Sequence, residues 1–189
     1  MESDWTPLTV TERRALLRLA RDSIAANLQR SPAPRLAAPT ASLSAPTGVF
    51  VSLHVASDLR GCVGTLAADR ALHENVTHLA VVAAFNDPRF PPLSPPELPA
   101  TDIEISRLTP PRPAAADEIV VGRDGVCVVL GERRGLLLPQ VAREHGWNAD
   151  RLLSEVCRKA QLPPASWQRP DCELLRFEAE IFSDRCVQA

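Results

Sequence analysis

Apolar residues near the start of the chain recur at steps of three and four, which is the period of a helix with one buried face. The residues in this pattern are Leu16, Leu17, Ala20, Ile24 and Leu28. Thr9 and Glu12 have the spacing of a capping box, in which each side chain bonds the other residue's backbone N–H. The sequence therefore predicts a helix over residues 9–30, and the same period predicts a second helix over residues 70–85.

Shorter stretches alternate between apolar and polar residues, as strands with one buried face do. The predicted strands cover residues 48–55, 59–66, 102–108, 119–121, 126–130, 135–138 and 173–182. Pro139 suits the first turn of a helix that ends at Gly146, and Asn148 suits the cap of a helix that runs to Lys159. Residues 31–46 are rich in Pro, Ala and Ser, which predicts a loop.

One order of elements occurs twice along the chain. The run 48–53 is followed by a second strand and a helix, and the run 125–130 is followed by the same pair of elements. Duplication of a strand–strand–helix unit and coincidence both account for this pattern. We expect an α+β fold in a single domain over residues 1–189, or in two lobes that share one core.

Composition and charge narrow the class of protein. Hydrophobic residues make up 45% of the 189 residues, which is enough to bury a core. The formal net charge of -2 provides no positive field for phosphates, so a nucleic-acid partner is not expected. No stretch reaches the roughly 18 apolar residues of a membrane span, and the acidic start lacks the apolar segment of a signal peptide. We therefore expect a soluble, cytoplasmic protein with no membrane partner.

The cysteines and histidines do not have the spacing of a metal site. The cysteines are odd in number, widely spaced and never arranged as C-x-x-C, which favours reduced thiols over disulfides or a zinc knuckle. His73 and His78 are five residues apart on the predicted second helix and do not share a face. With no glycine-rich phosphate loop either, we expect no metal and no cofactor. The five cysteines are Cys62, Cys127, Cys157, Cys172 and Cys186.

Residues 59–66 read Leu-Arg-Gly-Cys-Val-Gly-Thr-Leu, which resembles the Leu-Arg-Gly-Cys-Ile-Gly-Thr signature of the AMMECR-one domain family, with Val63 as a mild departure. Further segments resemble family blocks in the same order, so the resemblance spans about residues 48–182. These segments are residues 84–93, 103–106, 121–125, 135–141 and 157–160, together with Trp147. The resemblance implies a curved, largely antiparallel sheet with flanking helices and a repeated architecture.

The resemblance also implies partners, although it brings no established reaction. Members of this family occur in AmmeMemoRadiSam gene sets, beside a Memo-like protein similar to class III extradiol dioxygenases and a radical SAM (S-adenosylmethionine) enzyme. A shared pathway with these two proteins is therefore the expectation for this chain.

Cys62 is the strongest candidate for chemistry. Arg60 stands two positions away and could stabilise its thiolate, which would make the sulfur a catalytic nucleophile. Gly61 and Gly64 could let a ligand approach the backbone. The alternative is a buried cysteine that packs as a small apolar residue. His54 is a weaker candidate base, with a solvated surface residue as its alternative.

Four other residues are candidates for the same site. Asp87 and Arg89 either pair with each other to hold the proline-rich loop or bind a ligand. Glu104 is a candidate catalytic carboxylate if it lines a cleft, and otherwise a solvated side chain. Gln140 follows Pro139 at a predicted helix start, where it either contacts a ligand or caps its own helix.

Two classes of function remain open from the sequence. In the first, Arg60, Asp87, Arg89 and Glu104 surround Cys62 in a small-molecule pocket, with or without catalysis. In the second, the chain is a non-catalytic adaptor or binding partner for the Memo-like and radical enzymes. A nucleic-acid-associated protein is a third reading, which the balanced charge disfavours.

Overall fold

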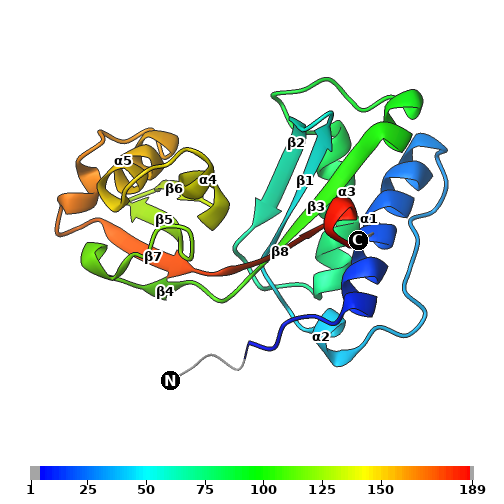
Figure 1. Cartoon of the computed structure of the whole chain (residues 1–189), viewed down its shortest axis with the longest axis horizontal. Coiled ribbons are helices and arrows are strands. Elements are labelled where there is room, and N and C mark those ends of the chain that lie inside the picture. The colour runs from blue at the N-terminus through cyan, green and yellow to red at the C-terminus, as the bar shows by residue number, and fades with distance from the viewer. Residues whose placement is uncertain (1–4, 188–189) are drawn as a thin grey trace. The chain divides into compact units, whose positions relative to one another are not determined.

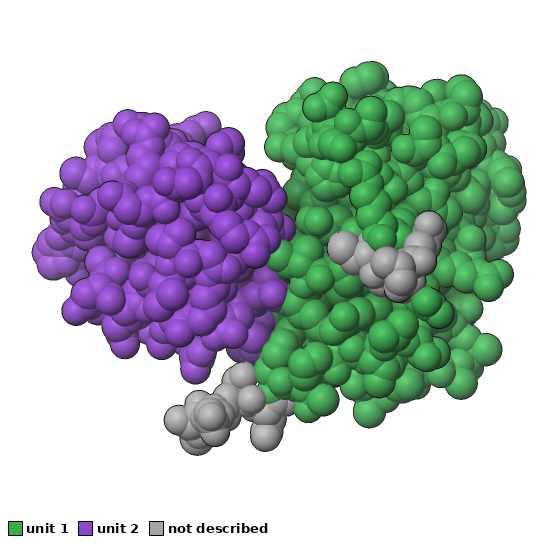
Figure 2. All heavy atoms as spheres, viewed as in Figure 1, with its two compact units in different colours: residues 1–108, 180–189 green, residues 109–179 purple. Residues whose placement is uncertain are grey.

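The computed structural model describes the backbone of residues 5–187 and the side chains of residues 5–185. The chain forms two compact units: unit 1 combines residues 1–108 with 180–189, and unit 2 comprises residues 109–179 (Figure 2). Each unit has its own cluster of buried apolar side chains. Within the described residues, no helix is long and apolar enough to cross a membrane.

Unit 1 is a four-stranded sheet with two long helices on one face (Figure 1). The strand order is β2-β1-β3-β8, and β1 is antiparallel to both β2 and β3. The strands are β1 (Val49–Val55), β2 (Asp58–Thr65), β3 (Thr101–Leu108) and β8 (Ala179–Ser183). The helices are α1 (Val10–Leu28), α2 (Ala41–Ser44), α3 (Leu72–Phe85) and α6 (Asp184–Val187), with a 3-10 turn η1 (Pro95–Ala100).

The alternation in β1 decides which face of the sheet is covered. Val49, Val51 and Leu53 are fully buried and join the cluster that includes α1 and α3. Because successive side chains in a strand point to opposite faces, Ser52 and His54 lie on the other face. That second face carries the polar residues from which the candidate site is built.

The predicted start of α1 is confirmed. Thr9 Oγ1 accepts a hydrogen bond from the Glu12 N–H, and the Glu12 carboxylate accepts one from the Thr9 N–H at 2.8 Å. Glu12 also accepts a hydrogen bond from the Thr40 hydroxyl at 2.6 Å, so the start of α1 is tied to the segment that follows its end. These hydrogen bonds lower the pKa of Glu12, with Thr40 as the largest cause.

Unit 2 contains a second antiparallel sheet, in the order β4-β7-β5-β6. Its strands are β4 (Arg112–Pro113), β5 (Gly125–Leu130), β6 (Arg133–Leu137) and β7 (Glu173–Phe177). Helices α4 (Pro139–Glu144) and α5 (Ala149–Lys159) complete the unit with the 3-10 turns η2 (Ala116–Glu118) and η3 (Ser166–Gln168), and α5 packs on β5 and β6. Asn148 caps α5 as predicted, since its side chain accepts from the Arg151 N–H at 2.9 Å.

The α+β class with antiparallel strands and flanking helices is confirmed, with two sheets in place of the single sheet expected. The repeated order is present as β1-β2-α3 in unit 1 and β5-β6-α4 in unit 2. The loop predicted over residues 31–46 contains one short helix, α2, because Thr40 Oγ1 caps it by accepting from the Leu43 N–H.

Two strand predictions are wrong in detail. Residues 119–121 are not a strand, because the Val120 N–H bonds the Asp124 carboxylate at 2.8 Å instead of a neighbouring strand. Residues 173–182 form two strands in different sheets, β7 and β8. The break falls at Glu178, whose N–H bonds the Thr109 hydroxyl at 2.8 Å.

Candidate functional site

A row of three functional side chains crosses the polar face of the unit 1 sheet. Ser52 in β1 lies opposite Cys62 in β2 and opposite Glu104 in β3. Residues directly opposite one another in antiparallel strands share a face, so all three side chains lie on the face away from the helices. The Ser52 hydroxyl donates a hydrogen bond to Cys62 Sγ at 3.2 Å. Cys62 and Glu104 are half-buried, and Ser52 is buried between them.

Asp87 and Arg89 hold the backbone of Cys62 from the segment that follows α3. The Asp87 carboxylate accepts hydrogen bonds from the Cys62 N–H at 2.9 Å and from the Arg89 N–H at 3.1 Å. The Arg89 guanidinium donates to the same carboxylate at 2.9 Å from Nε and 2.6 Å from Nη2. Its Nη2 also donates to the Cys62 carbonyl at 3.1 Å. We call these three residues the Cys62 clamp.

The clamp holds a buried negative charge beside a positive charge that faces solvent. Only 2% of the Asp87 side chain is exposed, against 55% of the Arg89 side chain. Hydrogen bonds from Arg89 hold the pKa of Asp87 well below its usual range, against the opposing effect of burial. Asp87 is therefore a carboxylate at neutral pH, and its role is to fix the strand that carries Cys62.

Arg60 has a different partner from the one the sequence suggests. It lies where the register between β1 and β2 shifts, and its Nε donates to the Glu97 carboxylate at 2.9 Å. Its Nη2 donates to the Pro92 carbonyl and to Glu97, both at 3.4 Å. The hydrogen bond from Arg60 is the largest cause that lowers the pKa of Glu97 to about 2. The guanidinium thus anchors η1 against the edge of β2.

Close packing against neighbouring residues explains why the positions on either side of Cys62, Gly61 and Gly64, are glycines. A Cβ on Gly61 would stand 2.2 Å from the Ala83 carbonyl oxygen, so only glycine lets α3 pack this closely on β2. A Cβ on Gly64 would stand 2.1 Å from the Phe50 ring, which lies across that residue. The ligand-binding role of Gly61 and Gly64 stays a prediction.

A small hollow of about 180 Å³ lies on the same polar face as Glu104. Within it, Asp102 pairs with the Arg185 guanidinium, which also donates to the Ser57 hydroxyl at 3.1 Å. His54 lies opposite Asp102 in the strand register, so the polar row continues one step along the sheet. The hollow is lined by His54, Ser57, Asp102, Glu104, Ser183 and Arg185.

Sequence reasoning missed Ser52 and the Asp102–Arg185 pair as parts of this face. The alternation of β1 places Ser52 on the polar face, but only the register shows that it stands between Cys62 and Glu104. Gln140 is the second residue of α4 and belongs to unit 2. Its ligand-binding role stays a prediction.

The other thiols differ from Cys62 in their surroundings. Cys127 and Cys157 are fully buried, and Cys172 is half-buried in unit 2. Burial is the largest cause that raises the pKa of each of these three thiols. All four cysteines with described side chains are free, and the Cys186 side chain lies outside the described residues. Over residues 5–185, no three His, Cys, Asp or Glu side chains are grouped as a metal site.

The model of the AMMECR1 family matches residues 17–182, which include the whole Cys62 clamp and most of both units. The chain belongs to the AMMECR1 family. Protein MK0488 of Methanopyrus kandleri is 42% identical over 187 residues, which cover 94% of this chain and 90% of that protein. A protein of Methanothermobacter thermautotrophicus is 40% identical over 188 residues, with 95% and 98% covered.

A solved structure shares the AMMECR1 fold described above. The crystal structure of the uncharacterized protein PH0010 from Pyrococcus horikoshii matches with a TM-score of 0.91 and 35% sequence identity. The match covers 96% of each chain, so both units have counterparts in that protein.

Proposed function

We propose that this chain binds a small molecule on the polar face of the unit 1 sheet, with Cys62 at the centre of the site. The observation that carries this proposal is the row formed by Cys62, Ser52 and Glu104. It brings a thiol, a hydroxyl and a carboxylate together on the face that the helices leave uncovered. A thiol and a carboxylate on one face, with a hydroxyl between them, are groups suited to covalent or acid–base chemistry on a ligand that spans the row.

Each proposed residue has a role in this site. The Cys62 thiol either acts as a nucleophile or contacts the bound molecule without reacting, and Glu104 accepts or donates protons. Asp87 and Arg89 position Cys62, and the exposed part of Arg89 offers its charge to a ligand. The remaining proposed ligand contacts on unit 1 are Arg60, Gly61 and Gly64, and the proposed ligand contact of Gln140 belongs to unit 2 by itself.

The clamp supports a site rather than plain packing. Only 2% of the Asp87 carboxylate side chain is exposed, and burying a charge costs free energy unless hydrogen bonds compensate for it. An apolar residue would fill a simple core without that cost. Instead, Asp87 accepts from the Cys62 N–H and Arg89 donates to the Cys62 carbonyl, so the pair fixes the peptide groups on both sides of the Cys62 Cα. Such second-layer support is typical of sites whose geometry must be held within a few tenths of an ångström.

We further propose that the protein works in the cytoplasm, in a pathway with a Memo-like protein and a radical SAM enzyme. A non-catalytic adaptor for those enzymes is the second candidate. It is favoured by the exposed Arg89, whose guanidinium lies 5.4 Å from the centre of the Phe90 ring. Arginine and aromatic residues are enriched among the residues that dominate protein interfaces.

The first test is whether a small molecule stays with the protein through purification and depends on Cys62. We would extract native preparations of wild type, Cys62→Ser, Glu104→Gln and Cys172→Ser and compare the released compounds by mass spectrometry. The proposal expects a compound in wild type and in the Cys172→Ser control that is depleted in both site variants. An equal load in all four proteins would contradict it.

The second test distinguishes the adaptor function from the small-molecule site. We would measure binding of the purified Memo-like and radical enzymes to wild type, Phe90→Ser and Cys62→Ser. The pocket proposal expects Cys62→Ser to lose the small molecule whether or not a partner binds. Loss of partner binding in Phe90→Ser, with no small molecule on any variant, would favour the adaptor.

A further inference from the structure

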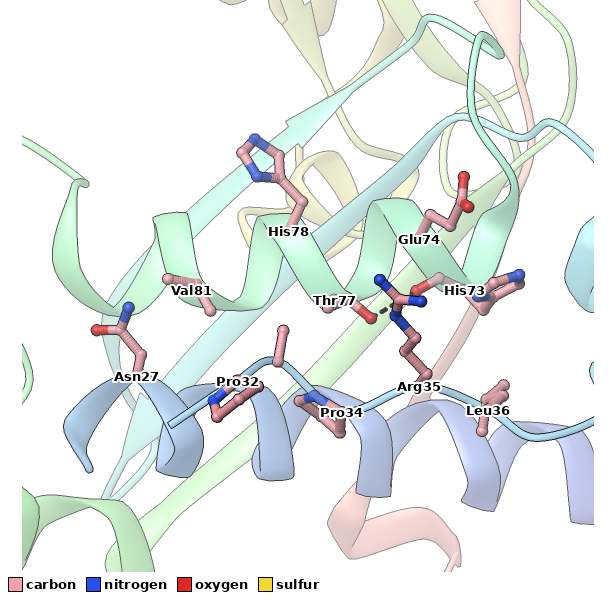
Figure 3. Close-up of a pocket in the computed structure, with 11 residues that line it drawn as sticks. Asn27, Pro32, Pro34, Arg35, Leu36, His73, Glu74, Thr77, His78 and Val81 are labelled. Atoms are coloured by element: carbon pink, nitrogen blue, oxygen red, sulfur yellow. Dashed lines mark hydrogen bonds between the residues drawn. The ribbon is translucent and has the colours of Figure 1, made fainter. Parts of the chain in front are cut away.

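Unit 1 contains a larger hollow on its helical side, whereas Cys62 lies on the opposite face of the sheet. The hollow lies between α3 and the segment that follows α1, and its volume is about 850 Å³ (Figure 3). This volume falls in the range of about 300–1,000 Å³ that is typical of small-molecule sites. Its walls come from the side of α3, the proline-rich segment after residue 31 and the end of α1 at Asn27.

The walls of this hollow are mainly apolar, and two prolines restrict the backbone of one of them. Pro32, Pro34 and Leu36 contribute from the segment after α1, and Val81 contributes from α3. Proline fixes the backbone angle φ, so this wall has little freedom to collapse into the space. A preformed hollow loses less conformational entropy when a ligand enters, which favours binding.

Arg35 supplies a positive charge at this apolar hollow. Its side chain is exposed, and among the described residues it has neither an ion-pair partner nor a hydrogen-bond partner. Figure 3 shows the guanidinium extending from the segment toward Thr77 and His73 on α3. The Thr77 hydroxyl already donates to the His73 carbonyl at 2.9 Å, so its hydrogen is not available to a ligand.

The acidic residues that share a hollow with Arg35 do not pair with it. Asp22 lines a second hollow together with Arg35 and pairs with Arg18 at 3.6 Å. Glu74 borders the larger hollow, but in Figure 3 its carboxylate extends from the other side of α3, away from the segment that carries Arg35. Asn27 adds an amide at the end of the hollow formed by α1. The combination is an unpaired guanidinium beside an apolar surface, with the polar side chains of His73, Thr77 and His78 along α3.

We propose that this hollow binds a small organic anion, with a carboxylate, sulfonate or phosphate on an apolar body. Arg35 contacts the anionic group, because a guanidinium matches the geometry of two oxygens at once. The apolar body lies against the prolines, Leu36 and Val81. This site is separate from the Cys62 site, and neither proposal depends on the other.

The test uses the full chain and 8-anilinonaphthalene-1-sulfonate, a fluorescent aromatic sulfonate. Titration of wild type should give saturable fluorescence, and Arg35→Gln should weaken binding about tenfold, the effect of roughly 1.4 kcal/mol. Arg169→Gln makes the same charge change at an exposed arginine in unit 2 and should leave the affinity unchanged. Neutral N-phenyl-1-naphthylamine should bind less tightly and should not respond to Arg35→Gln.

A second variant locates the probe. Val81→Trp fills the hollow and should abolish saturable binding of the sulfonate while circular dichroism stays that of wild type. If that variant does not fold, the exposed Arg35→Gln change still decides the question. Absence of saturable binding to wild type, or equal affinity of wild type and Arg35→Gln, overturns the proposal. Cys62→Ser should not change this affinity, so the result is distinct from the test of the Cys62 site.

Discussion

The Cys62 clamp predicts a specific loss of stability when Asp87 is replaced by Asn. The substitution keeps the shape but supplies only one acceptor oxygen where the carboxylate has two. In the folded protein Oδ2 accepts from the Cys62 N–H and Arg89 Nη2, and Oδ1 accepts from the Arg89 N–H and Nε. The amide must therefore present an NH₂ group to one pair of donors, and at least one backbone N–H loses its partner.

The magnitude follows from the separate parts of this arrangement. A hydrogen bond to a charged group contributes about 1.5–3 kcal/mol. The ion pair adds less than about 1 kcal/mol, because 55% of the Arg89 side chain is exposed and solvent screens it. We therefore expect the free energy of unfolding to fall by about 2–4 kcal/mol at pH 7. The control Arg89→Gln removes the ion pair and the hydrogen bond to the Cys62 carbonyl but leaves both backbone N–H groups bonded to the Asp87 carboxylate, so its loss should be the smaller of the two.

Urea unfolding at a series of pH values measures the free energy of unfolding of wild type and of both variants. The pKa of Asp87 is well below its usual range in the folded protein, so the carboxylate stabilises the fold fully above the unfolded pKa of about 3.9. That stabilisation is lost as the pH falls below this value, and the gap between wild type and Asp87→Asn should narrow there. A loss below about 0.5 kcal/mol at pH 7, or equal losses in Asp87→Asn and Arg89→Gln, would refute this reasoning.

Three further predictions concern unit 1. Gly61→Ala should lower the free energy of unfolding by about 3 kcal/mol or more, because its Cβ would stand 2.2 Å from the Ala83 carbonyl oxygen; denaturant unfolding measures this. Thr9→Ala should cost about 1 kcal/mol through loss of the capping box, seen as a lower thermal midpoint. Arg60→Gln should destabilise the protein at pH 7, and the difference from wild type should shrink as the pH falls from about 4.3 toward 2, because the pKa of Glu97 is about 2 in the folded state. A pH-independent difference would exclude the Arg60–Glu97 pair as its cause.

Periodicity in the sequence predicts most of the helices and strands, because local patterns determine them. The capping box of α1 and the alternation of β1 can be read directly from neighbouring residues. The division of residues 173–182 into two strands cannot be read in this way. Polar and apolar residues alternate without interruption from Arg176 to Ile181, and only pairing with distant partners assigns β7 and β8 to different sheets.

The candidate site shows the same limit. Cys62, Asp87 and Glu104 can be proposed from their residue types and from the family signature. Their geometry depends on register and on the path of the chain after α3, which no local pattern contains. Arg60 illustrates the difference. It stands two positions from Cys62 in the sequence, which predicts a contact with the thiol, but its guanidinium pairs with Glu97 in the structure.

The central claim is that Cys62 is the functional thiol among the four cysteines whose side chains the structure describes, and the rate at which each cysteine is alkylated tests it most directly. Folded protein is treated with iodoacetamide at pH 7.5, and mass spectrometry of digests gives the rate at each cysteine. We predict that Cys62 reacts first, and that Glu104→Gln or Ser52→Ala changes its rate but not that of Cys172. The matched unfolded protein in urea should label all cysteines at similar rates. Faster labelling of Cys127, Cys157, Cys172 or Cys186 in the folded protein, with Cys62 protected, would contradict the claim.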